Sequence, residues 1–472
     1  MRRVAAGAVA AIAAVAAGCG SGERAQGVPE GAAKAPADAV AFVSLRTNRA
    51  SAQWKRTTAV MRKLPAGTNI LESFDEARGA IGPETDVVWL DFADGGGNHV
   101  ILTKPSDLAR LKMLAAPDNF RYATLSGGWV AIGDQADVYK NEVKGEKLDG
   151  DKGFKHAFAK LDESAEVRAW VRGTAVQDAL DRTLAREGAA PRITHEAGNL
   201  RALAASARAE AGGVRFDIYG VIEPPPAPAT FARKLPDLIP ADAILYVGAT
   251  RLDVPTRLVL RMVADSKPRF RAQLEQVESV LGVTLEGDIY PLLERESALV
   301  VSPYPRFPSV MFVQKVADQT KADAVLRRLG AVAQVSGAVA VEPTRIEGVY
   351  AQQLTFRSQH VTVYAGVAHG MLYVTNARRS AADLIAGPRR PPLARDARFR
   401  FAWDRAKAPS KVAAFAYGDV SRGVPFVFDL VRRRGATVPP AVVANAKAVD
   451  DSLLYLVPDD DGLRLSGFTA IK

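Results

Sequence analysis

The chain has 472 residues, 48% of them hydrophobic and 24% charged, with a formal net charge of +10. This length predicts two or three domains, and the composition is typical of folded globular proteins rather than disordered chains. The chain has one cysteine, Cys19. This excludes internal disulfide bonds, and it leaves the body of the protein without a thiolate nucleophile or a cysteine-based metal site.

The N-terminal segment has the pattern of an exported protein. A pair of arginines precedes the apolar run Val4–Ala17, which is too short to cross a bilayer comfortably. Gly18 and Cys19 follow, and they resemble the lipobox of bacterial lipoproteins, with Ala16 in place of the usual leucine. The resemblance implies cleavage between Gly18 and Cys19, lipidation of Cys19 with palmitate-type chains, and stable attachment to the outer face of the cell membrane. An ordinary cleaved secretion signal is the alternative.

Composition divides the chain into five segments. Residues 1–18 are the expected lipoprotein signal peptide, and 19–35 lack hydrophobic periodicity, which predicts a flexible tether. Two long blocks follow, 36–223 and 240–472. The proline-rich stretch that begins "PPPAPAT" predicts a linker over 224–239.

The first block predicts strands and helices that alternate irregularly. In chain order they are a strand in "AVAFVSLR", a helix in "NRASAQWKRTTAVMRKL", strands in "TDVVWLDF" and "NHVILTK", a helix in "PSDLARLKML", strands near Tyr122 and in "GWVAIG", a helix in "FKHAFAKL", a strand in "EVRAWVR" and a hairpin that turns at Gly212–Gly213. Strands joined by short turns indicate an antiparallel sheet. We therefore expect an α+β fold, with a mainly antiparallel sheet and helices packed on one of its faces.

The second block repeats this plan. The opening "PADAVAFV" at Pro36 returns as "PADAILYV" at Pro240, and the helix start around Asp107 corresponds to the one around Asp323. Collinear matches of this kind indicate tandem duplication of one domain rather than a solenoid, because the period is near 200 residues. The sequence thus predicts two homologous α+β domains.

Two further matches fix the alignment of the C-terminal parts of the blocks. A constant spacing places "FKHAFAKLDESAEVRAWVRG" on "FRFAWDRAKAPSKVAAFAYG" and pairs Trp170 with Phe415. The closing hairpins align so that Ile222 meets Ile471. The second block has additional alternating segments within 331–369, which predict extra strands.

The repeated "PADA" openings, the aromatic helix before a strand and the lipobox together resemble an uncharacterised family of exported bacterial proteins. The family carries a domain-of-unknown-function label and is common in high-GC Gram-positive bacteria. The resemblance covers both blocks. It implies an extracytoplasmic location and a duplicated α+β body, and it implies no reaction.

No catalytic or metal-binding motif stands out. The five histidines are His99, His156, His195, His360 and His369. "THEAGN" has Asn199 where a zinc protease needs its second histidine, so we expect a loop there. "GGGNH" at 95–99 and "PDDDG" at 458–462 are interpreted as hairpin turns rather than as an anion cradle or a calcium loop. We expect no cofactor and no metal.

Arginines gather in the second block, and four of them define a possible anion-binding surface: Arg378, Arg379, Arg389 and Arg390. Arginine forks match phosphate and carboxylate geometry, so an anionic lipid or a cell-wall polymer is a candidate partner. Solvated surface charge is the alternative. Nucleic acid is not expected outside the cytoplasm, and a protein partner stays open.

The sequence therefore predicts a lipid-anchored extracytoplasmic protein that binds or scaffolds at the cell envelope, more consistent with a non-enzyme. Two alternatives remain, an envelope hydrolase with a carboxylate-based site and a carrier of an apolar ligand. An apolar cavity of several hundred Å³ would favour the carrier. If a ligand groove exists, we expect it in the cleft between the two blocks, since pockets favour such junctions.

Overall fold

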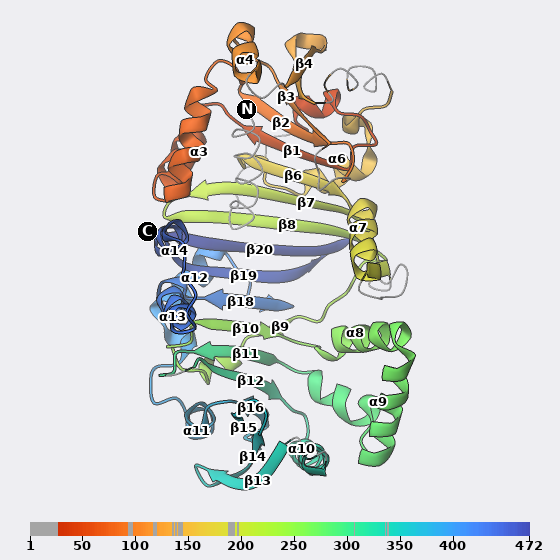
Figure 1. Cartoon of the computed structure of the whole chain (residues 1–472), viewed down its shortest axis with the longest axis vertical. Coiled ribbons are helices and arrows are strands. Elements are labelled where there is room, and N and C mark those ends of the chain that lie inside the picture. Colours follow the sequence, from red (N-terminus) through yellow and green to blue (C-terminus); the bar gives the residue numbers. More distant parts are fainter. Residues whose placement is uncertain are drawn as a thin grey trace.

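The computed structural model describes residues 27–92, 98–116, 120–134, 136, 139, 145–186, 194–195, 198–305, 307–335, 337 and 339–472. Within them, 18 strands form one sheet whose neighbours all run antiparallel (Figure 1). Helices pack against this sheet, which confirms the predicted mixed α+β class.

The first half contributes eight strands. They are β1 (Ala41–Arg46), β2 (Glu84–Trp89), β3 (His99–Thr103), β4 (Arg121–Thr124), β5 (Val130–Gly133), β6 (Val167–Arg172), β7 (Asn199–Glu210) and β8 (Gly213–Glu223). From the outer edge inward they pair in the order β4–β5–β3–β2–β1–β6–β7–β8.

The second half contributes ten strands. They are β10 (Leu245–Ala249), β11 (Ser297–Ser302), β12 (Ser309–Lys315), β13 (Val339–Ile346), β14 (Val349–Phe356), β15 (Val361–Ala368), β16 (Met371–Thr375), β18 (Ala414–Gly418), β19 (Val449–Asp459) and β20 (Gly462–Ile471). Their order is β13–β14–β15–β16–β12–β11–β10–β18–β19–β20. The short strands β9 (Phe231–Ala232) and β17 (Lys411–Val412) pair separately.

The two halves have the same strand order. From β20 out to β16, each strand of the second half takes the place of one from β8 out to β5, and β15 takes the place of β4 as the hairpin partner of the next strand. The hairpin β13–β14 is an addition at the outer edge, within the region where the sequence predicts extra strands. The order agrees with a repeated folding plan.

The halves meet edge to edge through β8 and β20. Their ladder runs from Val221 opposite Gly462 to Gly213 opposite Ala470, and its centre pairs Asp217 with Ser466. Asp217 and Ser466 are themselves equivalent positions, so a local two-fold axis passes between them. The Ser466 hydroxyl also donates to the Asp217 carboxylate. Two separate domains are therefore not confirmed, because one sheet runs through both halves.

The repeated "PADA" segment performs the same task twice. Pro36 forms an isolated antiparallel bridge with Lys147, and Pro240 forms one with Pro392. In both halves the N–H of the following alanine donates, at 3.0 Å, to the carbonyl of the residue before that bridge partner. Each "PADA" thus fastens the entry of its half to the segment that leads into the aromatic helix.

Parts of the expected tether and linker are structured. In the tether 19–35, the 3-10 helix η1 (Glu30–Lys34) forms, and Ala32 and Ala35 are fully buried against the first-half core. Within the linker 224–239, Leu235 and Ile239 are fully buried in the second-half core. Small or apolar side chains in these segments pack against a hydrophobic core. The lack of hydrophobic periodicity in the sequence does not predict such packing.

The strand register corrects one predicted match. Phe42 pairs with Trp170, and its counterpart Tyr246 pairs with Tyr417, so Trp170 corresponds to Tyr417 and not to Phe415. The helix before this strand explains the shift: α6 (Lys152–Ala159) has 8 residues, whereas α12 (Ala397–Ala406) has 10. A slip of two residues keeps the same face of a strand, so the apolar pattern does not detect it.

A second match is also displaced. Asp107 accepts a hydrogen bond from the N–H of Arg110 and so caps α4 (Leu108–Ala115). Asp318 accepts in the same way from the N–H of Lys321, at the start of α10 (Gln319–Val335). The counterpart of Asp107 is therefore Asp318 rather than Asp323.

The main cores lie where α6 and α12 cover equivalent parts of one sheet face. The Phe154 ring lies 5.4 Å from Trp170 in the first half, and the Phe399 ring lies 5.1 Å from Tyr417 in the second. On the opposite face, Leu111 of α4 packs against Val87. Helices thus lie on both faces of the sheet, whereas the sequence analysis expects them on one face only.

The remaining helices lie mainly near the strand ends (Figure 1). They are α2 (Ala52–Met61), α3 (Pro65–Glu76), α7 (Gly173–Arg186), α8 (Asp253–Ser266), α9 (Pro268–Leu281), α11 (Arg378–Ala386), α13 (Val420–Arg433) and α14 (Pro440–Ala448). Among the residues that the structure describes, no helix combines the length and the apolarity needed to cross a membrane.

Candidate functional site

An apolar pocket lies at the junction of the halves, bounded by α2 and α3, by strands on both sides of the β8–β20 seam, and by α14. Its volume is about 530 Å³, within the range of small-molecule sites. Most of its wall is apolar. The larger apolar side chains that line it include Val60, Met61, Ile70, Val214, Val442 and Ile471. The pocket therefore offers mainly hydrophobic contacts.

Local sequence places the first wall of the pocket. The Ser51 hydroxyl accepts a hydrogen bond from the N–H of Trp54 at 3.0 Å and caps α2. Thr57, Val60 and Met61 then fall three and four residues apart, which puts them on one helix face. Pro65 begins α3, where its missing N–H is not needed.

Contacts between the halves close the opposite wall. The N–H of Ala66 in α3 donates to the Asn445 side-chain oxygen in α14 at 3.0 Å. The Lys63 ammonium donates to the carbonyl of Ile471 in β20 at 3.2 Å. Beneath them Val60, Ala209 and Ile471 form a small buried cluster. The pocket thus depends on residues more than 370 positions apart in the chain.

One carboxyl group borders this apolar pocket. Glu166, just before β6, is only 6% exposed. Its Oε2 accepts from the N–H of Ala209 at 3.2 Å, while Oε1 has no partner of standard hydrogen-bond geometry among the described residues. Burial raises the pKa of Glu166 to about 7, although hydrogen-bonding contact with the side chains of Thr57 and Gln53 acts to lower it.

Glu166 also borders a second, polar pocket of about 350 Å³. That pocket is lined by charged side chains of both signs, including Glu84, Arg46 and Lys104. The hydroxyl of Thr57, on the apolar side, is buried and likewise lacks a described partner. Glu166 and Thr57 thus lie close to each other at the apolar pocket, but neither Glu166 Oε1 nor the Thr57 hydroxyl makes a hydrogen bond of standard geometry with a described residue.

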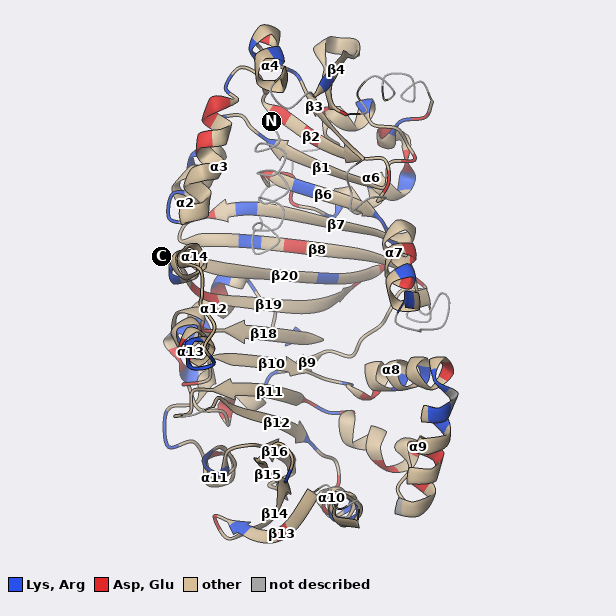
Figure 2. Cartoon of the chain, viewed as in Figure 1, with Lys and Arg blue, Asp and Glu red and all other residues tan. Residues whose placement is uncertain are grey.

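The predicted arginine surface lies on and next to α11, and its members are Arg378, Arg379, Arg389 and Arg390. Asp383 lies 3.7 Å from Arg379 and 3.6 Å from Arg389, and Asp242 pairs with Arg390. Arg378 donates to the Thr344 hydroxyl at 3.2 Å. Arg379 and Arg390 border one pocket of about 370 Å³ together with these two aspartates. Figure 2 shows acidic and basic residues interspersed over both halves.

Among the described residues, the other residues and motifs considered in the sequence do not come together in one catalytic or metal-binding site. Gly18 and Cys19, and the three glycines of "GGGNH", lie outside the described residues. The histidines are dispersed: the His195 ring lies 2.9 Å from the Asn199 side-chain oxygen, and His360 and His369 occupy turns with positive φ. Among the described residues no three metal-ligating side chains cluster.

The "PDDDG" segment is a hairpin turn, as predicted, between β19 and β20. The turn also connects the halves. Asp459 accepts from the Lys160 ammonium at 2.8 Å, and Asp461 accepts from the Tyr219 hydroxyl and contacts His156. These acidic residues therefore have structural partners in the first half.

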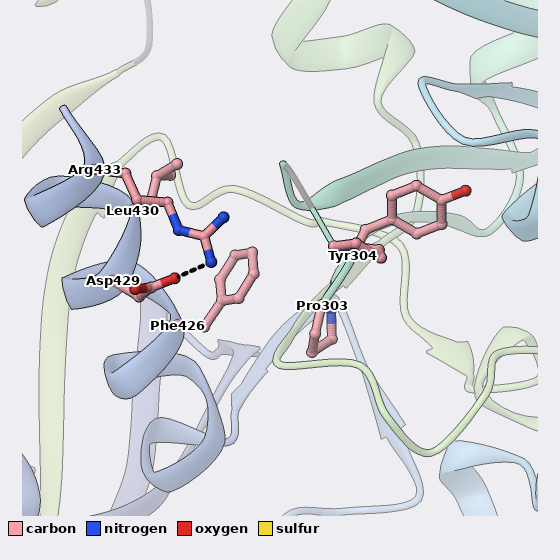
Figure 3. A pocket seen from close by; sticks show the side chains of 7 residues that line it. Pro303, Tyr304, Phe426, Asp429, Leu430 and Arg433 are labelled. Atoms are coloured by element: carbon pink, nitrogen blue, oxygen red, sulfur yellow. Dashed lines mark ion pairs between the residues drawn. The ribbon is translucent and has the colours of Figure 1, made fainter.

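A smaller pocket of about 330 Å³ lies between α13 and the loop after β11 (Figure 3). Phe426 points toward Pro303, and Asp429 pairs with Arg433 at 2.7 Å on the helix rim. No lining side chain described here has a buried polar atom that lacks a partner. The junction pocket differs because it combines a larger apolar wall with unpartnered polar groups.

The fold and the junction pocket define a mixed α+β protein with a single extended antiparallel sheet and a ligand-sized apolar site. The chain belongs to the DUF3352 family of proteins of unknown function, whose model matches residues 107–468. This confirms the expectation of an uncharacterised family.

Comparison with curated proteins gives no match. Among solved structures, crystal forms IV, III and I of TP0453 are similar to parts of the chain at 12%, 7% and 5% identity. They cover 50%, 42% and 44% of this chain and 81%, 81% and 89% of TP0453, with TM-scores of 0.28, 0.25 and 0.24. Scores this low support no argument about fold or function.

Sequence reasoning did not identify Glu166. The available signal was an acidic residue directly before strand β6 in one half, where the other half has alanine. In the observed register Glu166 corresponds to Ala413, which is equally buried at 6% exposure. The predicted alignment, two residues out, instead placed a lysine opposite Glu166.

Proposed function

We propose that this protein binds an apolar ligand in the junction pocket. The observation that carries the proposal is a pocket of about 530 Å³ with a mainly hydrophobic wall, built by both halves of the chain. Burial of apolar ligand surface there contributes roughly 25 cal/mol per Å² before the costs of association. The predicted cleft between the blocks and the carrier alternative both agree with this proposal.

A binding experiment with a matched pair of variants on α14 tests it. Ala446 lines the pocket, whereas Ala441 is exposed and does not. We expect the fluorescence of the uncharged dye N-phenyl-1-naphthylamine to rise on binding to the wild-type protein. Ala446→Trp fills the pocket and should weaken binding at least tenfold, while Ala441→Trp should leave it unchanged. Equal dye binding by all three proteins would show that the pocket is not the site.

We further propose, from the sequence, that the protein acts at the outer face of a cell membrane through lipid on Cys19. An apolar ligand has low solubility in water, so a binding protein held at a lipid surface lies next to its source. Anionic lipid or wall polymer remains the proposed partner of the arginine surface. No reaction is proposed.

Cell fractionation tests the anchor. Cys19→Ser should move the protein from the membrane fraction to the soluble fraction, and Ser21→Ala should not. Membrane retention of the Cys19→Ser protein at wild-type level would exclude lipid on this residue as the anchor.

A further inference from the structure

Glu166 has an unusual position for a residue with a purely structural role. A carboxyl at 6% exposure with an unpartnered oxygen costs stability, because buried polar groups normally have hydrogen-bond partners. The fold does not require it, since the second half accommodates Ala413 at the equivalent buried position. A group that destabilises the fold and that the duplicate lacks is a candidate for function.

We propose that Glu166 receives the polar head of the ligand, and that this ligand is an amphiphile with one apolar chain and an uncharged, hydrogen-bond-donating head such as a hydroxyl. The inference rests on the proposed function of the junction pocket. The chain would lie along the apolar wall, and the head would lie where Glu166 separates the apolar pocket from the polar one.

The hydrogen-bonding groups at this end of the pocket determine which ligand head group can bind there. Glu166 Oε2 already accepts from the N–H of Ala209, which leaves Oε1 as an acceptor. The Thr57 hydroxyl, which lies near Glu166 without a hydrogen bond of standard geometry, can donate. A hydroxyl head both donates and accepts, so it can satisfy Glu166 and Thr57 together.

Charged heads fit less well. A carboxylate cannot donate to Glu166 Oε1, and it would add a second negative charge at a desolvated site when Glu166 is ionised. An ammonium would pair with the ionised Glu166 carboxylate, but taking both charges out of water at this buried position can cost more than their attraction returns.

Three probes with the same chain distinguish these heads: 1-decanol, decanoate and decylammonium. Their binding to the purified full chain would be measured by calorimetry at pH 8. We expect 1-decanol to bind at least tenfold more tightly than either charged probe. Glu166→Gln removes the charge and should reduce the preference over decanoate to less than threefold. Glu166→Ala, which copies the second half, should weaken 1-decanol at least fivefold.

Glu275→Gln, which removes an exposed carboxylate on α9, is the control and should bind all probes as the wild type does. Circular dichroism would establish that each variant is folded. Wild-type binding of decanoate or decylammonium as tight as that of 1-decanol, or unchanged affinity of Glu166→Ala for 1-decanol, would overturn the head assignment while the pocket proposal stands. Failure of all three probes and the neutral dye to bind would overturn both.

Discussion

The two halves share a strand order but differ in how they cover one face of the sheet. Val87 is 2% exposed in the first half, whereas its counterpart Leu299 is 39% exposed in the second. At the neighbouring position Ala41 is 5% exposed and Leu245 is 37% exposed. The face under α6 and α12 is buried in both.

This difference shows which parts of the repeated plan are constrained. Strand order follows from backbone pairing and from the aromatic packing of Phe154 and Phe399, which both halves retain. The opposite face has diverged: in the first half Leu111 of α4 packs against it, and α2 covers the part that reaches the seam. The junction pocket lies on that diverged face, so the binding site arises where the repeat is least symmetric.

The largest loss of stability should come from substitutions in the aromatic cores that both halves share. Phe154→Ala and Phe399→Ala each remove a fully buried ring, and each should lower the free energy of unfolding by about 3–5 kcal/mol. Because β8 and β20 join the halves, we expect a single unfolding transition for both variants. Urea unfolding followed by circular dichroism and by tryptophan fluorescence measures this, and two separated transitions would mean that the halves fold independently.

Substitutions on the sheet face opposite α6 and α12 should lower the free energy of unfolding by smaller amounts, which differ between the two halves. Val87→Ala deletes two buried methyl groups and should cost about 2 kcal/mol, whereas Leu299→Ala should cost less than about 1 kcal/mol because Leu299 is already partly solvated. Chemical denaturation of both variants tests the comparison. A loss of about 2 kcal/mol or more for Leu299→Ala would show that this face is covered in solution.

Much of this comparison was accessible from the sequence. The closing hairpins were aligned correctly because the turns at Gly212–Gly213 and at "PDDDG" carry clear turn chemistry. The two-residue error at Trp170 arose because alternation has a period of two and cannot register such a slip. The β8–β20 seam was not predicted, since an edge strand that pairs with another half has the same pattern as one that faces solvent.

The pocket was inferred only as a cleft between blocks. Its walls combine α2 and α14, which are far apart in the chain, and no local pattern specifies that contact. Glu166 was missed because its significance depends on burial and on the correct counterpart, Ala413. Both require the register that the strand pairing provides.

Glu166 has alanine as its counterpart in the second half, and it should make the free energy of unfolding depend on pH. Its pKa is about 7 in the folded protein and close to 4.3 when unfolded, so the folded state binds the proton more tightly. The resulting stabilisation is complete below about pH 4 and is lost as the pH rises through 7. Relative to Glu166→Gln, the wild type should lose about 2–3 kcal/mol of unfolding free energy between pH 5 and pH 8. Parallel pH curves for the two proteins would contradict the assignment.

The smallest effect concerns the repeated "PADA" segments. Asp242 pairs with Arg390, which is 53% exposed, whereas its counterpart Asp38 makes no ion pair with any described residue. Asp242→Asn should therefore cost less than about 1 kcal/mol, an effect that 1 M salt removes, and Asp38→Asn should have no salt-dependent effect. Unfolding at low and high salt measures both. A larger, salt-resistant loss at Asp242 would mean that Arg390 fixes the fold of the second half; the expected small loss would leave its guanidinium able to exchange Asp242 for an external anion.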